Sequence, residues 1–388
     1  MAVPTEPTIY DGTAGVSKNT TLLTHTAAKY VPKFREVVFT NTPFLKSLAL
    51  SAFGKKAVIG DTSFGDVTKT SGKGITFNKG GYQFEFPLMT TAPSSYQVSR
   101  MDNISPQHND PGKGGAYAWT RFVVPVYIPE EFMLDNVGSG RLMDRFKTEM
   151  KLAQMAAIRD LNYIILGHAS APTDSPVGLS KMVSVTQTTD RTVGGIDVAE
   201  DWWKNQYASC TSVGGGGDVD RPLSLLRKMQ KHLLTIRAMS GSSNEQTLVG
   251  TPGAWQYYDR ARYADQTSNG MPSLSNKSYD AADIDHLVFQ GRPFIYDSAV
   301  TGPYGATAST ESIYFLDYNE FGVNFKANEY FKVEGWEAPR AHDVRRFHQM
   351  NIWYRCVPYV TNRRIQGVLH SIPANSDAAA TAATIPTS

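Results

Sequence analysis

Cysteine is scarce in this sequence, and its two cysteines, Cys210 and Cys356, lie far apart. Neither belongs to a CxxC pair or to a run of cysteine and histidine, which excludes a zinc finger or a zinc ribbon. Two thiols also make no disulfide framework, so a reducing cytoplasm is the expected site of synthesis. We therefore predict that both cysteines are free thiols without a role in stability.

Long hydrophobic runs are lacking as well. No stretch approaches the roughly 18 apolar residues of a membrane span. The first residues lack the basic-then-apolar pattern of a signal peptide. We expect no membrane partner.

Charge is low and unevenly placed. Charged residues make up 19% of the chain, against about 25% in a typical soluble domain. Either other subunits cover much of the surface, or a large core carries polar, uncharged loops. The net charge of +2 excludes a polyelectrolyte binder as a whole, but residues 1–60 and 221–239 are rich in Lys and Arg, while residues 310–337 hold six acids and two lysines. Such an uneven distribution of charge suits a protein layer that has nucleic acid on one side. The alternative for each cluster is an ordinary solvent-exposed face.

Common catalytic motifs are also missing. No Gly-Lys of a phosphate-binding loop, no GxGxxG that opens a helix, no GxSxG and no HExxH occurs. Asp283, Asp285 and His286 come nearest to a metal cluster, but carboxylates before an apolar run more often mark the solvated start of a strand. Trp202 and Trp203 are expected to pack in a core rather than to form a ligand cage. We predict no catalytic, cofactor-binding or metal-binding residue.

The N-terminal third contains few aliphatic residues. Residues 1–53 indicate an extended arm that docks on another surface. Residues 54–125 are punctuated by Gly and Lys, and Tyr82, Phe84 and Phe86 alternate with polar residues as in a strand. Because this segment cannot form its own core, we predict a long hairpin that projects from the body.

Residues 139–167 carry the clearest helical pattern. Apolar residues recur at intervals of three or four at Leu142, Phe146, Met150, Ala153, Ala157, Leu161 and Ile164. They form one stripe, with Asn162 and most charged residues opposite and Asp160 as an exception. Ser139 suits an N-cap and Gly167 a C-terminal stop. We predict a helix roughly 40 Å long that forms the spine of a lobe, with a coiled-coil helix as the alternative.

The remaining residues predict an α+β lobe followed by long strands. Helices are predicted at 222–239 and 252–264, and strands at His286–Phe289, Phe294–Tyr296 and Ile313–Leu316. Residues 346–370 alternate again and predict long strands around a turn near Pro358–Asn362. An Ala/Thr-rich tail follows.

This order of parts resembles the tailed-bacteriophage major capsid proteins of the Hong Kong 97 fold. Softer local likenesses are the segments Ile128–Phe132, Thr192–Asp197 followed by Trp202-Trp203, Phe289–Phe294 and Tyr314–Asp317. The resemblance spans about residues 20–370 and implies an α+β fold. Its parts would be an N-terminal arm (1–53), an extended β-hairpin loop (54–125), a peripheral domain with the spine helix (126–210 and 335–372), an axial α+β domain (211–334) and a C-terminal tail (373–388).

The resemblance also implies a function. The chain would self-assemble into hexamers and pentamers of an icosahedral shell that encloses phage double-stranded DNA, and would lie in the virion capsid after assembly in the host bacterial cytoplasm. Its implied partners are other copies of the chain, a portal, and DNA bound without sequence specificity on the inner face. Either a separate scaffolding protein or no scaffold is implied, and a decoration protein is an open alternative. A nanocompartment shell protein of the encapsulin type is the alternative within the fold. A hydrolase with the hairpin as a lid is an alternative outside it.

Two features depart from the family. Many members carry a long, charged, helical segment before the hairpin that acts as a built-in scaffold, whereas the residues before 54 have no helical pattern here. The founding member also joins its subunits by a Lys–Asn isopeptide bond. Nothing singles out one of the hairpin lysines (Lys55, Lys56, Lys69, Lys73 and Lys79) for that chemistry, so no crosslinking residue is predicted.

Overall fold

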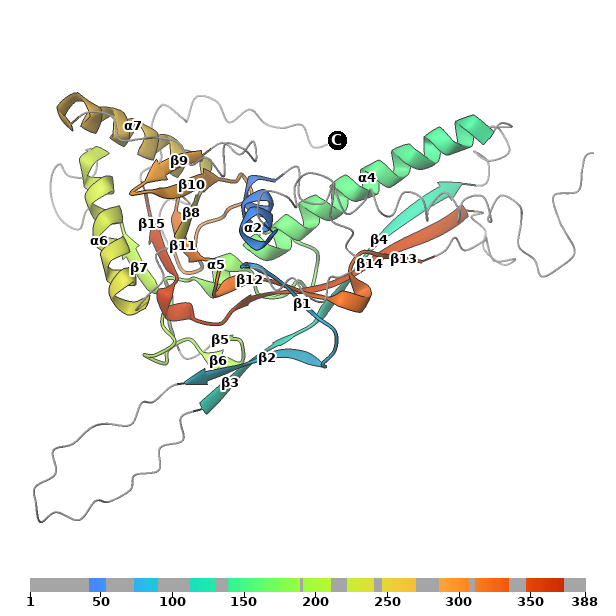
Figure 1. The fold of residues 1–388 in the computed structure, drawn as a ribbon, viewed down its shortest axis with the longest axis horizontal. Helices are drawn as coiled ribbons and strands as arrows, with labels where there is room; N and C mark the ends of the chain where they lie inside the picture. Colours follow the sequence, from blue (N-terminus) through green and yellow to red (C-terminus); the bar gives the residue numbers. More distant parts are fainter. Residues whose placement is uncertain are drawn as a thin grey trace, which may run out of the picture.

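The computed structural model describes residues 42–53, 73–89, 112–129, 139–188, 191–210, 222–240, 246–269, 286–306, 311–334 and 347–372. In these ranges two larger sheets, a projecting hairpin and several helices pack together (Figure 1). The α+β class predicted from the sequence is confirmed. The segments before residue 42 and after residue 372 lie outside the described residues, and so do the arm and the tail predicted there.

The first sheet joins strands from both halves of the chain. Within the described residues it contains β1 (Ile75–Asn78), β12 (Phe321–Lys326), β14 (Phe347–Val360), β13 (Lys332–Val333) and β4 (Thr120–Pro129). Cys356 pairs with both Phe325 of β12 and Thr120 of β4, so these two strands lie on opposite edges of β14. The short helices η2 (Ala327–Glu329) and η3 (Arg363–Ile365) follow β12 and β14.

The alternation predicted for β14 is confirmed. Met350, Ile352, Tyr354 and Cys356 are buried, and the residues between them are half-buried. The strand continues to Val360, so the turn begins slightly later than predicted.

The second sheet forms the lobe that the sequence predicted. Among the described strands its order is β7 (Gln206–Ser209), β15 (Gly367–His370), β11 (Ile313–Asp317), β8 (Gln246–Gly250), β10 (Arg292–Tyr296) and β9 (His286–Phe289). Helices α6 (Pro222–Ser240) and α7 (Pro252–Asn269) each begin with proline in the first turn. Apolar residues of α6 and α7 share a core with one face of the sheet, including Phe294 and Phe315. Its other face, including Tyr314, joins the larger core around α4.

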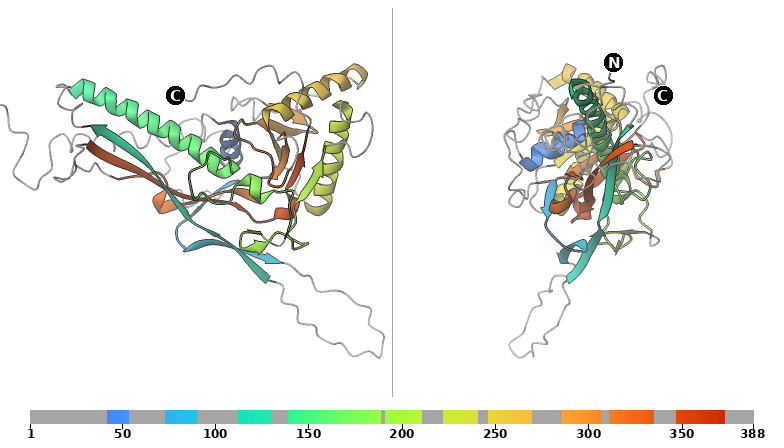
Figure 2. Two further views of the ribbon diagram at one scale, coloured as in Figure 1. Left: turned by 180° about the vertical axis from the view of Figure 1, so that it is seen from behind. Right: turned by 90° about the vertical axis from the view of Figure 1, so that its right-hand side faces the viewer.

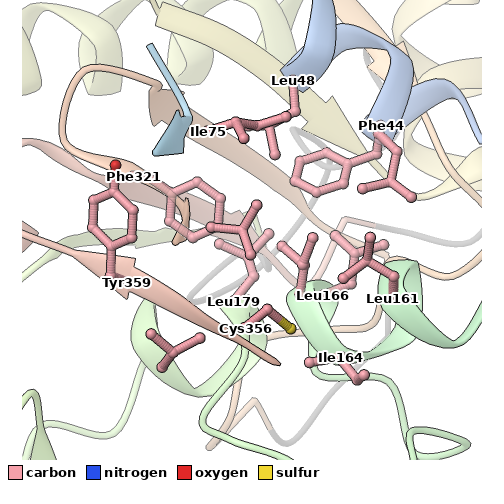
Figure 3. Close-up of a cluster of buried hydrophobic side chains, with 14 of the residues drawn as sticks. Phe44, Leu48, Ile75, Leu161, Ile164, Leu166, Leu179, Phe321, Cys356 and Tyr359 are labelled. Atoms are coloured by element: carbon pink, nitrogen blue, oxygen red, sulfur yellow. The ribbon is translucent and has the colours of Figure 1, made fainter. Parts of the chain in front are cut away.

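Helix α4 (Ser139–Leu166) confirms the predicted spine and packs on β4 and β14 (Figures 1 and 2). Gly167 ends it with a φ of +71°. The N–H of His168 donates to the carbonyl of Tyr163 at 3.0 Å, as in a Schellman motif. Ala157 of the predicted stripe is fully buried, and so are Leu161 and Ile164 (the latter two are labelled in Figure 3). The side chains of Leu142, Phe146 and Met150 lie outside the described part.

One assignment on this helix was wrong. Asn162, predicted on the polar side, is 2% exposed. It is buried because its amide binds the carboxylate of Asp297, at the end of β10.

The interpretation of residues 43–53 as part of an arm is also wrong. They form the helix α2 (Pro43–Phe53), in which Leu45 is fully buried. Phe44 and Leu48 of the same helix are fully buried as well (Figure 3). The helix has no exposed polar stripe because the core surrounds it, so its sequence lacks the amphipathic pattern of a surface helix.

The start of the predicted hairpin needs the same correction. Ile75 is fully buried, and β1 pairs in parallel with β12 of the first sheet. The hairpin itself consists of β2 (Gln83–Met89) and β3 (Gly112–Ala118), and β4 already belongs to the first sheet.

The proposed domain boundaries at 210/211 and 334/335 do not coincide with the sheets. β7 and β15, which the sequence placed in the peripheral domain, pair within the second sheet. β12 and β13, which it placed in the axial domain, pair within the first. The chain crosses between the sheets several times, and pairing across such distances leaves no local sequence signal.

Candidate assembly surface

The β2–β3 hairpin projects from one side of the body, next to β5 (Thr192–Val193) and β6 (Ile196–Asp197) (Figures 1 and 2). Its strands pair from Gln83 with Ala118 to Met89 with Gly112. Phe86 is buried and Phe84 partly buried on one side, while Glu85 on the other side is exposed, which confirms the predicted period of two. Tyr82 precedes the strand and is 95% exposed, so its place in that pattern was wrong.

Aromatic rings fix the base of the hairpin to the body. The Phe86 ring stacks on Tyr117 of β3 at 5.7 Å and on Trp203 at 6.3 Å between ring centres. The Phe84 ring lies 5.0 Å from that of Tyr359 on β14. Trp203 is 1% exposed, which agrees with its predicted packing role. Large aromatic side chains thus replace the aliphatic residues that this segment lacks.

Tyr117 also forms a polar contact inside this aromatic cluster. Its hydroxyl donates to the carbonyl of Val360 at 3.0 Å and accepts the N–H of Val360 at 3.2 Å. Burial raises the pKa of Tyr117 far above its ordinary value, so the hydroxyl keeps its proton. The N–H of Ala116 donates to the carbonyl of Gly194 at 2.9 Å, in the turn between β5 (Thr192–Val193) and β6 (Ile196–Asp197). The hairpin base is therefore part of the subunit core.

A buried arginine organises the loops behind the hairpin base. Arg363 is fully buried and donates to the carbonyls of Met182 at 2.6 Å and Trp203 at 3.2 Å, and to the hydroxyl of Ser184 at 3.0 Å. Met182 ends the short helix α5 (Leu179–Met182). Burial lowers the pKa of Arg363 to about 10, which still leaves it charged at neutral pH.

Farther along its described strands, the hairpin contacts the body through the partly buried Leu88, which packs against the larger core, and through exposed groups. The Lys113 ammonium lies 3.6 Å from the Glu200 carboxylate and 5.4 Å from the centre of the Trp202 ring. Both side chains of this ion pair are largely exposed, so it adds little stability. Buried aromatic rings thus hold the base of the hairpin, and Leu88 and an exposed ion pair hold the described residues beyond it.

The face of the first sheet opposite α4 is open along β4. Arg121, Val123, Trp353 and Arg355 lie on this side, because paired and alternate residues of a sheet point the same way. We call these four residues the outer sheet face. Glu329 lies 2.9 Å from Arg355 and 3.7 Å from Arg121, so two guanidinium groups share one carboxylate. The Arg121 guanidinium also lies 4.0 Å from the centre of the Trp353 ring.

The residues that the sequence analysis considered for chemistry do not converge. Asp283 and Asp285 lie outside the described residues, and His286 is half-buried on β9. In the described part of the chain, no group of three or more His, Cys, Asp or Glu residues is placed to hold a metal ion. Cys210 and Cys356 are buried free thiols, as predicted. No described helix is long and apolar enough to cross a membrane.

No protein-family model and no curated protein matches this sequence. Solved structures do match. The capsid asymmetric unit of cyanophage A-1(L) aligns with a TM-score of 0.53 at 11% identity, over 77% of this chain and 90% of that one. The capsid of a native GTA particle aligns with a TM-score of 0.45 at 12% identity, over 83% of this chain and 97% of that one. The holo encapsulin complex of Synechococcus elongatus aligns with a TM-score of 0.45 at 12% identity, over 81% of this chain and 90% of that one. The chain therefore has the fold of the cyanophage capsid protein, the fold expected from the order of its parts.

Proposed function

We propose that this chain is the major capsid protein of a tailed bacteriophage, a structural subunit that assembles into an icosahedral shell. The observation that carries the proposal is the hairpin. Its base is buried by Phe86, Tyr117 and Trp203, while Met89 at the far end of β2 is 95% exposed. An arm of this kind gains a stable environment when a neighbouring subunit covers it. The shared fold with a cyanophage capsid protein supports the same function.

Hexamers and pentamers are the capsomers we propose. The peripheral part would contain α4 with the first sheet, and the axial part would contain the second sheet with α6 and α7. The hairpin and the segment before residue 42 would extend each contact beyond the roughly 1,600 Å² of a standard protein interface.

Packaged double-stranded DNA is the proposed content of the shell. Helix α6 carries the exposed cations Arg227 and Lys231 and has no acidic residue. Such a helix would attract phosphates without reading sequence, and the attraction would weaken as salt screens it. A portal and a separate scaffolding protein are further proposed partners, and the virion assembled in a bacterial cytoplasm is the proposed location.

Electron microscopy of the purified chain, alone and with a co-expressed scaffold, tests this function. The proposal expects ring-shaped capsomers or closed particles of uniform size. Nuclease treatment of particles from infected cells then separates the two kinds of shell. Protected double-stranded DNA supports the phage capsid, whereas a protein cargo supports a nanocompartment. A well-folded monomer under all these conditions would exclude both.

A further inference from the structure

Arg363 lies in the segment where the chain passes from the first sheet to the second. β14 of the first sheet ends at Val360, η3 follows, and β15 of the second sheet begins at Gly367. The Arg363 side chain is fully buried within this crossover. Its contacts therefore influence how the two sheets are joined.

The guanidinium group of Arg363 binds two further stretches of chain. Its Nε donates to the carbonyl of Met182 at 2.6 Å, and one terminal nitrogen donates to the Ser184 hydroxyl at 3.0 Å. The other terminal nitrogen donates to the carbonyls of Trp203 at 3.2 Å and Val198 at 3.5 Å. These acceptors lie 160 to 181 residues before Arg363 in the chain. One side chain thus fixes distant segments relative to the crossover.

The chemistry of this contact indicates a role in geometry. All four acceptors are neutral oxygens, so none of them compensates the buried charge, and the guanidinium group remains charged at neutral pH. Apolar residues of similar volume often stabilise a core more than buried charged groups do. A planar guanidinium group, however, holds its donors in fixed directions and so fixes the positions of several acceptors at once.

The stretches that Arg363 binds also carry contacts of the hairpin. The Trp203 ring stacks on Phe86 of β2, and its indole N–H donates to the carbonyl of Val193 at 3.2 Å. Gly194, the next residue, accepts the N–H of Ala116 on β3 at 2.9 Å. Both strands of the hairpin are therefore attached to residues whose position depends on Arg363 through Trp203.

A third hairpin contact reaches the same crossover. The hydroxyl of Tyr117 on β3 bonds with the N–H and the carbonyl of Val360, three residues before Arg363. Tyr117 is itself buried, and the charge of Arg363 acts on its hydroxyl. The hairpin is therefore attached to the crossover itself and to the segments that Arg363 binds to it.

The length of the hairpin amplifies any change at its base. β2 has seven residues and projects away from the body (Figure 2). A turn of about 10° at the base would move the far end of such a strand by roughly 4 Å, because a strand rises about 3.3 Å per residue. Small shifts of the residues around Arg363 would thus redirect the exposed end of the hairpin.

We infer that Arg363 is a positioning residue that fixes the direction of the hairpin relative to the second sheet. It acts through Trp203 and Val360, entirely within one subunit. Its consequence for assembly rests on the proposed function: in a shell, the direction of the hairpin would set the angle between neighbouring subunits and hence the uniformity of particle size.

Spin labels on the unassembled, full-length subunit test the direction of the hairpin. Labels at Met89→Cys on β2 and Leu234→Cys on α6, both exposed positions, measure the distance from the hairpin to the second sheet. Arg363→Lys keeps the charge but lacks the planar group that reaches all four acceptors. It should shift or broaden the distance distribution by roughly 4 Å or more. The native thiols are buried and stay unlabelled.

Two controls separate a change of direction from general loosening. Labels at Leu152→Cys and Leu234→Cys, both outside the hairpin, should give the same distance with Arg363 or lysine at position 363. Leu248→Ala leaves a cavity in the core beneath α6 and α7, so it should lower the melting temperature without changing the distance from Met89 to Leu234.

A milder variant keeps the test decisive if Arg363→Lys does not fold. Ser184→Ala removes one acceptor only and should broaden the same distribution to a smaller extent. An unchanged distance distribution in a folded Arg363→Lys chain, or in Ser184→Ala where that chain does not fold, would overturn the inference.

Electron microscopy then tests the consequence for assembly. Arg363→Lys should give particles of mixed diameter or open shells where the wild type gives one size. Uniform particles of wild-type diameter from this variant would overturn the link between the hairpin's direction and particle size. Failure of the wild type itself to assemble would contradict the proposed function instead, and it would leave the spin-label result unaffected.

Discussion

The side-chain amide of Asn162 on α4 donates to both carboxylate oxygens of Asp297, at 3.2 and 3.1 Å. The same carboxylate accepts the N–H of Ala299 at 2.9 Å and the N–H of Phe44, in the first turn of α2, at 3.4 Å. One buried carboxylate thus joins the spine helix, the end of β10 and the helix that follows the N-terminal segment. A negative charge at the start of a helix is favourable, which partly offsets the cost of burial.

Replacing Asn162 with alanine should destabilise the subunit by about 1–3 kcal/mol, because a buried carboxylate loses a donor. Denaturant unfolding monitored by tryptophan fluorescence measures the change. Gln83→Ala is the matched control, since the Gln83 amide also donates to a carboxylate, that of Glu85, but both groups lie at the exposed surface. Equal stability of the two variants would contradict the role given to Asn162.

Asp297 should also make stability depend on pH. Burial is the main cause that raises the pKa of its carboxyl above the ordinary aspartate value. The folded state then binds the proton more tightly than the unfolded state, so this group's contribution is greatest at low pH and is lost as pH rises through the raised pKa. Asp297→Asn should remove this component and flatten the stability profile in the pH range just above the ordinary aspartate pKa. A variant profile parallel to that of the wild type would exclude the effect.

Local patterns predicted the elements that have one apolar side. The stripe on α4 and the alternation of β14 are visible within a few turns or residues, because each faces a core on one side only. Helix α2 was missed because it is surrounded by core, and β1 was assigned to the hairpin because its partner β12 lies more than 200 residues away. Asn162 was misplaced for a similar reason, since its partner Asp297 comes from another part of the chain.

The candidate assembly surface was predicted only in part. The scarcity of aliphatic residues and the Gly/Lys-rich turns indicated a projecting hairpin, and the structure contains one. The outer sheet face was not predicted. Arg121 and Trp353 approach each other only because β4 pairs with β14. No sequence motif indicates that pairing.

Helix α4 offers a paired test of burial. Leu161 is fully buried and Leu152 is 55% exposed on the same helix. Leu161→Asp should abolish folding, because an unpaired buried charge costs several kcal/mol. Leu152→Asp should fold like the wild type, as judged by solubility and circular dichroism. Cooperative melting of a soluble Leu161→Asp subunit would overturn the spine assignment.

The two thiols should be unreactive in the folded subunit. Burial raises the pKa of Cys210 to about 11 and that of Cys356 further still, so neither forms the reactive thiolate at neutral pH. Thiol titration should detect neither group in the native protein. Both should react after unfolding without a reductant, whereas a disulfide would leave none to react.

The central claim is that the hairpin acts between subunits rather than within one. Because Met89 pairs with Gly112, residues 90–111 can be replaced by an Asn-Gly turn that closes the hairpin and leaves its aromatic base intact. The most direct measurement is electron microscopy of this variant beside the wild type, with the melting temperature of each unassembled subunit as the control for folding. We predict an unchanged melting temperature and a failure to form closed particles. Closed particles of normal size from the shortened chain would contradict the account.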